Sequence, residues 1–376
     1  MTDPAAPTAA PTSTPVKGPR RRPPKSTRFD LDRSQLAELL EGHPRYRVDQ
    51  VWTGLYEQLA DPGSLTTLPK ALRLELEGRL PLALHPVTES VSDRGETVKW
   101  LWELHDGTQV ETVLMHYDDR STVCVSTQAG CAMGCSFCAT GQAGFDRQLS
   151  AGEIVEQVVR AARRAREDGR RLSNVVFMGM GEPLANYDAT WASVERIHGA
   201  VGLSARHLTV STVGIVPGIR RLAAEALPVN LAVSLHAADD ELRDELVPIN
   251  RRYPLTTLMQ ACAEYLVAKG RRLSFEWALI DGVNDRDVDA DQLIDRARSL
   301  PLPAHVNLIP LNPTPGYAVR GSSPRRVRAF QERLRAGGVN ATVRRTRGTE
   351  IDAACGQLRA THEILAAASA SAPPAR

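Results

Sequence analysis

The sequence contains no apolar run approaching the roughly 20 residues that a membrane-spanning helix needs. We therefore expect no role in a membrane. Its first residues, MTDPAAPTAAPTSTPVKGPRRRPPK, include paired arginines, but no apolar segment follows them as an export signal requires. The sequence therefore favours a cytoplasmic protein.

The chain also lacks a strong charge imbalance. Its formal net charge is only +2 over 376 residues, so composition alone does not indicate a nucleic-acid ligand. Positive charge is gathered locally, however, and we keep two interpretations of it: a solvated helix face or a phosphate-binding surface. The arginines concerned are Arg344, Arg345 and Arg347 in VRRTRG, and Arg325, Arg326, Arg328, Arg333 and Arg335 before it.

Cysteine is scarce, but three of the six cysteines fall within eight residues. Cys131, Cys135 and Cys138 form a C-x3-C-x2-C loop. The others are Cys124, Cys262 and Cys355. In a cytosolic chain this clustering indicates metal or redox chemistry rather than structural disulfides. Cys262 has helical apolar neighbours and is interpreted as an inert buried thiol.

The chain is long enough for one large domain and a smaller companion. Residues 1–28, rich in Pro, Ala and Thr, are expected to be a disordered tail. Residues 29–84 have helical apolar spacing broken at Pro62 and Gly63, and they predict a small helical domain. Residues 85–120 predict a β-rich connector with a hairpin turn at Asp106 and Gly107. The remainder divides into residues 121–350 and a C-terminal segment, 351–376.

From residue 121 onward, strands rich in Val, Leu and Ile alternate with amphipathic helices. The candidate strands are STVCVST (121–127), NVVFMGM (174–180), HLTVST (207–212), NLAVSLH (230–236), LSFEWALI (273–280) and HVNLIPL (305–311). The segment AGEIVEQVVRAARRARED (151–168) is typical of a helix with one apolar face. This alternation predicts an α/β fold whose parallel sheet curves into a partial (βα)6 barrel with helices outside.

Polar residues and glycines follow these strands at their carboxyl ends, where α/β proteins bind ligands. They are Cys131, Gly181, Glu182, Ser211, Ser234, His236 and Asn312. Three thiolates bind only three irons of a four-iron cluster, so the fourth iron has no protein ligand. That iron can chelate an amine and a carboxylate. Zinc with a distant fourth ligand remains the alternative. Glu182 could accept hydrogen bonds from an ammonium group or belong to an ordinary tight turn, and His236 could equally be a satisfied core histidine.

Together the cysteine loop and the segment after the second strand resemble the radical S-adenosylmethionine superfamily. From Phe29 onward the chain is similar to the RlmN and Cfr family of RNA adenine methyltransferases, with RlmN the nearer relative. The segments that carry the resemblance are VSTQAGCAMGCSFCATGQ, FMGMGEPLAN, SLHAADDELRDELVPIN, NLIPLNPTPG and RTRGTEIDAACGQL.

The resemblance implies a [4Fe-4S] cluster on Cys131, Cys135 and Cys138 and two molecules of S-adenosylmethionine per turnover. One would methylate Cys355, and the other would yield a 5′-deoxyadenosyl radical that abstracts hydrogen from that methyl group. An electrophilic ring carbon cannot attack the methyl group of a sulfonium directly. The radical carbon carried on the cysteine sulfur can add to it instead. Cys124 would then release the product by forming a disulfide with Cys355, and Glu111 would remove the ring proton. For Glu111 the alternative is an exposed strand carboxylate.

The resemblance also implies cofactor contacts and partners. The contacting residues would be Gly181, Glu182, Ser211, Ser234, Leu235, His236 and Asn312. The product would be adenine methylated at C2, at nucleotide 2503 of 23S rRNA and nucleotide 37 of tRNA. The helical domain would bind RNA, and flavodoxin or ferredoxin would donate electrons. Two other hypotheses stay open: methylation at C8, as in Cfr, and a zinc-containing RNA-binding protein without enzymatic activity.

Overall fold

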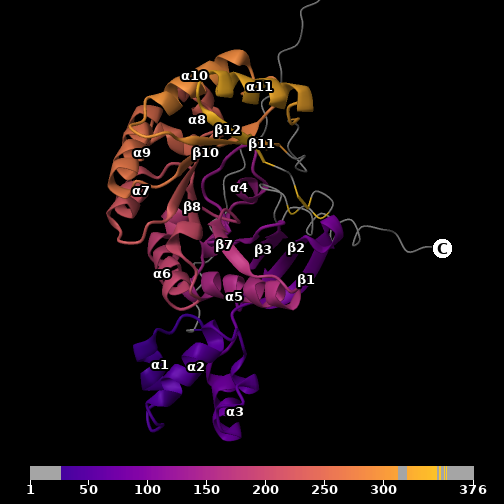
Figure 1. Ribbon diagram of the computed structural model, residues 1–376, viewed down its shortest axis with the longest axis vertical. Coiled ribbons are helices and arrows are strands. Elements are labelled where there is room, and N and C mark those ends of the chain that lie inside the picture. The colour runs from indigo at the N-terminus through magenta and orange to yellow at the C-terminus, as the bar shows by residue number, and fades with distance from the viewer. Residues whose placement is uncertain (1–26, 312–319, 345–346, 349–350, 352, 354–376) are drawn as a thin grey trace, which may run out of the picture.

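The computed structural model describes residues 27–311, 320–344, 347–348, 351 and 353. A ten-stranded sheet dominates it (Figure 1), in the order β1-β2-β3-β4-β7-β8-β9-β10-β11-β12. The strands are β1 His85–Ser92, β2 Thr97–Glu103, β3 Gln109–His116, β4 Ser121–Cys124, β7 Leu172–Phe177, β8 Leu208–Thr212, β9 Asn230–Ser234, β10 Leu273–Leu279, β11 His305–Pro310 and β12 Asn340–Val343. Neighbours from β4 to β12 are parallel, and β1 to β4 are antiparallel. Since β1 and β12 end this order, the sheet is a partial rather than a closed barrel.

All six strands predicted from the sequence are present. The first is shorter than predicted, because β4 ends at Cys124 and the chain continues into β5 (Gln128–Gly130), which pairs with β6 (Phe145–Gln148). The sequence pattern does not predict a seventh parallel strand, β12. Its four residues follow two glycines, Gly337 and Gly338, and are too few for a clear periodic signal.

Helices cover the outer face of the parallel strands (Figure 1). They are α5 Ala151–Glu167, α6 Tyr187–Gly199, α7 Val216–Ala224, α9 Leu255–Lys269, α10 Asp287–Arg298 and α11 Pro324–Ala336. Two short helices, α4 Ala139–Ala143 and α8 Asp240–Leu246, lie in the connections after β5 and β9. Single 3-10 turns occur at Pro62–Ser64, Asp93–Gly95, Pro183–Asn186, Ala205–His207 and Pro248–Arg251. No described helix is long and apolar enough to span a bilayer.

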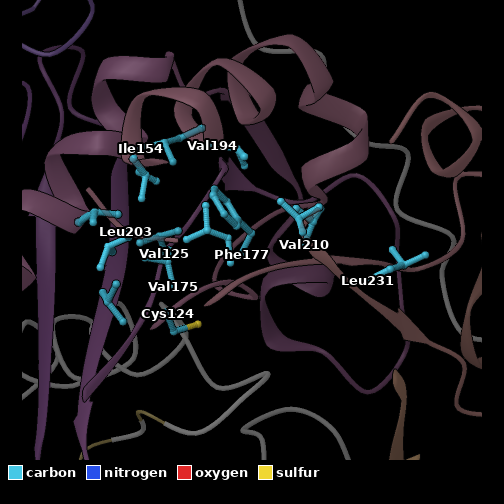
Figure 2. Close-up of a cluster of buried hydrophobic side chains, with 14 of the residues drawn as sticks. Cys124, Val125, Ile154, Val175, Phe177, Val194, Leu203, Val210 and Leu231 are labelled. Carbon is cyan, nitrogen blue, oxygen red and sulfur yellow. The ribbon is translucent and has the colours of Figure 1, made fainter. Parts of the chain in front are cut away.

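The main core lies between the sheet and these helices. α5 begins at a capping box in which Ser150 accepts the backbone N–H of Glu153. Its predicted apolar face is buried, as the positions of Ile154 and Val158 illustrate. Figure 2 shows Ile154 beside Val175 and Phe177 of β7 and beside Val125, which directly follows β4. The periodicity of the sequence therefore indicates the packed side of this helix correctly.

The inner face of the parallel strands is unusually polar. Residues in alternate positions point to the same side of a sheet, so Asn230 and Ser234 share one face of β9, as Ser274 and Glu276 share one face of β10. The other residues of this inner face include Thr122, Asn174, Thr209, Ser211, His305, Asn307 and Thr342. The barrel interior is therefore lined for contact with polar ligands rather than filled with aliphatic side chains.

The predicted hairpin is confirmed between β2 and β3. Gly107 has a φ of +79°, and Asp106 accepts hydrogen bonds from the backbone N–H and the hydroxyl of Thr108 at 3.1 and 2.7 Å. Together with β1, this hairpin extends the main sheet beyond β4. The β-rich segment 85–120 is thus physically continuous with the barrel.

Three helices precede the sheet: α1 Arg33–Leu39, α2 Tyr46–Tyr56 and α3 Lys70–Arg79. They form a separate group in the lower part of Figure 1. Arg196 on α6 donates to the carbonyls of Phe29 and Leu31 and to the Tyr56 hydroxyl. Arg163 on α5 pairs with Asp61 at 3.1 Å. Arginines of the barrel helices thus hold the helical group through its backbone and carboxylates.

The boundary expected for the N-terminal tail is wrong by at least two residues. Arg28, predicted to be disordered, is buried and donates to the Leu80 carbonyl at 3.1 Å. Its guanidinium also forms an ion pair with Asp61 at 2.5 Å. Composition does not reveal this anchor, because Arg28 directly follows a sequence rich in Pro, Ala and Thr.

Candidate active site

The cysteine loop leaves the barrel after β5 and ends where α4 begins. Gly130 has a φ of +74°, and a Cβ there would lie 2.1 Å from the carbonyl oxygen of Gly144, so only glycine fits. Beside it, the backbone N–H of Cys131 donates to the same oxygen at 2.7 Å. The loop is therefore closed at its base, and its three cysteines line one cavity.

The three thiols influence one another electrostatically. Burial, together with the charges of Cys138 and Glu182, raises the pKa of Cys131 to about 12. Burial also raises the pKa of Cys135, with added contributions from the other two cysteines. Three thiolates so close together would repel one another unless a positively charged group lay between them. Soft sulfur donors of this kind suit an iron–sulfur cluster.

A single metal ion is a different case. The described residues include no group of three or more His, Cys, Asp and Glu side chains that could hold one metal ion. An iron–sulfur cubane is wider than one ion, so its thiolate ligands stand further apart. The donor set and the shared cavity thus fit the cluster implied by the sequence.

Glu182 lines the same cavity and ties two strand ends together. Oε1 accepts the backbone N–H of Leu184 at 2.9 Å, and Oε2 accepts that of Val213 at 2.8 Å. Burial raises the pKa of this carboxyl to about 7, which these hydrogen bonds partly oppose. The Thr212 hydroxyl also bonds to this carboxylate, so one of its four lone pairs is left. The carboxylate can therefore support the loop and still accept a hydrogen bond from a ligand.

Gly181 is required by the close approach of two loops. Its φ is +96°, and a Cβ would lie 2.4 Å from the Cβ of Gln128. The amide of Gln128 accepts the backbone N–H of Glu182 at 2.7 Å. The glycine therefore lets the segment after β7 pack directly on β5, which brings Glu182 beside the cysteine loop.

Ser211, Ser234 and His236 line the same cavity as the cysteines and Glu182. Leu235 does not line it, because its side chain is fully buried in the core. Asn312 lies outside the described residues. The structure thus brings together three of the five more distant candidate contacts.

His236 has an unusual backbone and a fixed tautomer. Its φ is +58°, and its Nδ1 accepts the backbone N–H of Ala278 at 2.9 Å, so the ring proton of the neutral form is on Nε2. Burial and the nearby Arg243 charge lower its pKa to about 3. Its ring lies 4.6 Å from that of Phe137 in an edge contact. His236 is thus both a satisfied buried residue and a wall of the cavity.

Arg243 is the main residue of this region that sequence reasoning misses. Its fully buried guanidinium donates to the carbonyls of Leu235 at 3.0 Å and Val213 at 2.7 Å, and to Asn250 Oδ1 at 2.8 Å. It therefore fixes the ends of β8 and β9 that carry the cavity wall. The pattern ELRDEL contains no signal for this role, since its acidic neighbours suggest a solvated helix.

Glu111 and Cys124 share the inner face of the sheet. Cys124 pairs with Val113, which is two positions beyond Glu111 on β3, so both side chains point to the same side. Glu111 is 3% exposed and lies 3.4 Å from Lys99 Nζ, so it is not the exposed strand carboxylate of the alternative interpretation. Figure 2 shows Cys124 at the margin of the cluster formed by Val125 and Val175. Cys355, the proposed partner of Cys124, lies outside the described residues.

Cys262 is confirmed as a buried thiol. It lies on α9, is fully buried, and has its pKa raised to about 12 by that burial. A thiol with so high a pKa has almost no thiolate at neutral pH, and the thiolate is the reactive form.

Some arginines of the helix α11 already form ion pairs within the protein. Arg326 pairs with Asp287 at 2.6 Å and Arg333 with Asp291 at 2.6 Å, whereas Arg335 donates to the carbonyl of Ala341. The other two members of the group, Arg325 and Arg328, are exposed. Arg347 pairs with Glu96, Arg344 lines the cavity, and Arg345 lies outside the described residues.

Comparison with known proteins agrees with this geometry. Residues 125–294 match the family model of the radical SAM superfamily. The chain is 54% identical to a probable dual-specificity RNA methyltransferase RlmN of Parafrankia sp. (strain EAN1pec), over 91% of this chain and 93% of that one. The corresponding protein of Chloroflexus aurantiacus is 51% identical, over 89% and 93%.

A solved structure gives the same result. The crystal structure of a radical SAM methyltransferase from Sphaerobacter thermophilus has a TM-score of 0.86 and 54% identity, covering 89% of this chain and 99% of that one. The partial barrel with its cysteine-lined cavity therefore defines a radical S-adenosylmethionine enzyme. Within that class, the chain belongs to the RlmN family of dual-specificity RNA methyltransferases.

Proposed function

We propose that this enzyme methylates carbon 2 of adenine in RNA, at nucleotide 2503 of 23S rRNA and nucleotide 37 of tRNA. The observation that supports this most is one cavity lined by three thiols and Glu182 in a chain of the RlmN family. The wider conclusion, a radical SAM enzyme acting on RNA, rests on the family itself. The position on the ring is the proposed part.

In this proposal Cys131, Cys135 and Cys138 hold a [4Fe-4S] cluster. When bound, the cluster supplies an electron to S-adenosylmethionine, the radical chemistry from which the superfamily takes its name, and flavodoxin or ferredoxin supplies that electron. The closed base of the loop at Gly130 keeps the three thiols on the cavity side. The polar residues that line the same cavity are available for the cofactor.

The cofactor is held by residues at the strand ends: Gly181, Glu182, Ser211, Ser234, Leu235, His236 and Asn312. Glu182 accepts a hydrogen bond from the ammonium group of the methionine portion with the lone pair that its three partners in the protein leave. The serine hydroxyls line the same cavity and can donate or accept. The side chain of Leu235 is enclosed in the core and its backbone N–H and carbonyl bond within the protein, so it acts by positioning its neighbours Ser234 and His236.

The methyl group travels through Cys355, so one turnover consumes two molecules of S-adenosylmethionine. Carbon 2 of adenine lies between two ring nitrogens and is too electron-poor to attack a sulfonium methyl group directly. A cysteine that carries the methyl carbon avoids this difficulty but leaves the base joined to the protein. Cys124 resolves that link by forming a disulfide with Cys355.

Glu111 is the base that removes the proton from carbon 2. It lies on the inner face two positions before Val113, the residue that pairs with Cys124. Glu111 and Cys124 can therefore both reach the same adenine ring. Its carboxylate forms an ion pair with Lys99 at 3.4 Å, which holds it in place on this face.

The helical group of residues 29–84 binds RNA beside the barrel of residues 121–350, with the C-terminal segment 351–376 delivering Cys355. The helical group is joined to α5 and α6 by arginine contacts. It therefore provides a fixed second surface for a large RNA.

Anaerobic incubation of the reconstituted enzyme with a methyl-labelled cofactor, reductant and each RNA tests the proposal. Digested RNA is compared with 2-methyladenosine and 8-methyladenosine standards. The 2-methyl product supports the proposal, and the 8-methyl product alone favours the Cfr-type alternative. Zinc in place of iron and sulfide, with no product, favours the binding protein.

A further inference from the structure

A second hollow, of about 590 Å³, opens at the other end of the barrel, where the parallel strands begin. We call it the arginine basin after five of its lining residues, Arg120, Arg206, Arg271, Arg272 and Arg344. These arginines come from loops and one 3-10 turn, in four separate parts of the sequence. The fold therefore gathers them at one place, which the sequence pattern does not predict.

The basin has a strong excess of positive charge. Glu276 is the one carboxylate among its lining residues. His305 adds no charge near neutral pH, because burial and Arg272 lower its pKa to about 4. Arg120 is partly compensated by Asp119 at 3.0 Å. Among the ion pairs of the described residues, none includes Arg206, Arg271 or Arg272.

The remaining lining suits a ligand that is polar as well as anionic. Asn174, Thr209 and Asn230 contribute amides and a hydroxyl, and Thr122 and Thr342 add further hydroxyls. Arginines with amide and hydroxyl groups are the usual contacts of nucleic-acid phosphates and sugars. An apolar partner would leave these groups buried without hydrogen bonds, which is costly.

The basin leads to the site already described. Met178, Glu276 and Arg344 line both the basin and the cysteine cavity, so the two hollows share a wall. Along β9, Asn230 lines the basin and Ser234 the cavity, a separation of about 13 Å at roughly 3.3 Å per residue. Cys124 lies on the same face of the sheet as Thr122, which lines the basin.

We propose that the arginine basin binds RNA phosphates next to the target adenine, so that the flipped-out base enters the barrel from the end where the strands begin. This inference rests on the proposed function, since it places the RNA of that reaction. A nucleotide turned out of its stack must reach past its own backbone. Phosphates held in the basin would direct that base past Glu276, which lines both hollows, towards Cys124 on the inner face.

The test measures binding of a tRNA anticodon stem-loop to the full-length, cluster-loaded enzyme over a range of KCl concentrations. Arg206→Gln with Arg272→Gln removes two exposed charges. The matched control, Arg325→Gln with Arg328→Gln, removes two exposed charges from the outer face of α11. We expect the basin variant to bind at least about tenfold more weakly and to lower the slope of log Kd against log [KCl] by about 1.5, while the control keeps the wild-type slope.

Arg206→Lys with Arg272→Lys should restore the slope, because lysine binds phosphate as a point charge. Thermal unfolding checks that each variant is folded, and the single Arg206→Gln variant should lower the slope by about half as much. Equal slopes for wild type and both glutamine variants would overturn the inference. The inference would also be overturned if the basin variant bound RNA as wild type does but its cluster were reduced more slowly by flavodoxin. The basin would then bind an acidic electron donor. If the wild type binds RNA in this way but does not methylate it, the proposed function fails instead.

Discussion

The Nδ1 atom of His236 accepts the backbone N–H of Ala278 at 2.9 Å, and this contact joins the end of β9 to β10. It is possible only while the imidazole is neutral. Burial and the Arg243 charge keep it so, with a pKa of about 3. The cavity wall at the carboxyl end of the sheet thus depends on a histidine that does not titrate near neutral pH.

Replacing His236 with Asn should remove part of the acid sensitivity of the fold. The folded pKa is below the unfolded value of about 6.5, so unfolding takes up a proton and stability falls as the pH drops below 6.5. Between pH 8 and pH 5 this costs about 2 kcal/mol. Asn tolerates the positive φ and offers an oxygen to Ala278. Urea unfolding at both pH values measures the drop in the free energy of unfolding from pH 8 to pH 5. This drop should be about 2 kcal/mol smaller in the variant than in wild type, and equal drops would show that His236 is not held neutral in the folded protein.

Glu182→Gln should destabilise the protein by about 1–3 kcal/mol, because an amide can accept only one of the two backbone N–H groups that the carboxylate now accepts. Its affinity for S-adenosylmethionine should fall as well. Glu264→Gln, on the exposed face of α9, is the control and should change neither quantity appreciably. Denaturant unfolding and calorimetric titration give the two values. A variant as stable as wild type would show that the two hydrogen bonds do not hold the loop.

Gly181→Ala should disrupt the cavity, because the added Cβ would lie 2.4 Å from Gln128 and the φ of +96° is unfavourable for alanine. Gly78→Ala provides a contrast, since a Cβ there meets nothing within 4 Å and the site lies in helix α3. We expect that change to stabilise its helix by about 0.5–1 kcal/mol. Thermal unfolding and cofactor binding of both variants test the pair. Normal cofactor binding by Gly181→Ala would contradict the packing argument.

Cys131→Ala should leave the reconstituted protein without a full complement of iron and sulfide. Cys262→Ala should retain both, because that thiol is enclosed in α9 away from the cavity. Iron and sulfide analysis with the visible absorption spectrum distinguishes the two. Equal loss in both variants would mean that misfolding, rather than a missing ligand, explains the result.

The parts of this molecule that are local in sequence could be predicted, and the parts that depend on distant contacts could not. The cysteine loop, Glu182 and the six strands follow from spacing and periodicity. Arg243 could not be recognised, because its partners Val213 and Asn250 come from other loops and its neighbours are acidic. The burial of Arg28 depends on Asp61, which is far along the chain.

The polarity of the barrel interior was equally hidden. Single residues such as Asn230, Ser274 and Asn307 appear as small interruptions of apolar strands, and only the parallel register brings them to one surface. The arginine basin has the same origin. Register and strand order, rather than residue type, determine these two features.

The most direct test of the account is the product of one anaerobic reaction. Wild-type enzyme with full cluster occupancy, reductant, labelled S-adenosylmethionine and tRNA should yield 2-methyladenosine, and Cys355→Ala should yield none. If the wild type cleaves its cofactor yet leaves the RNA unmodified, or gives 8-methyladenosine alone, the proposed reaction is wrong.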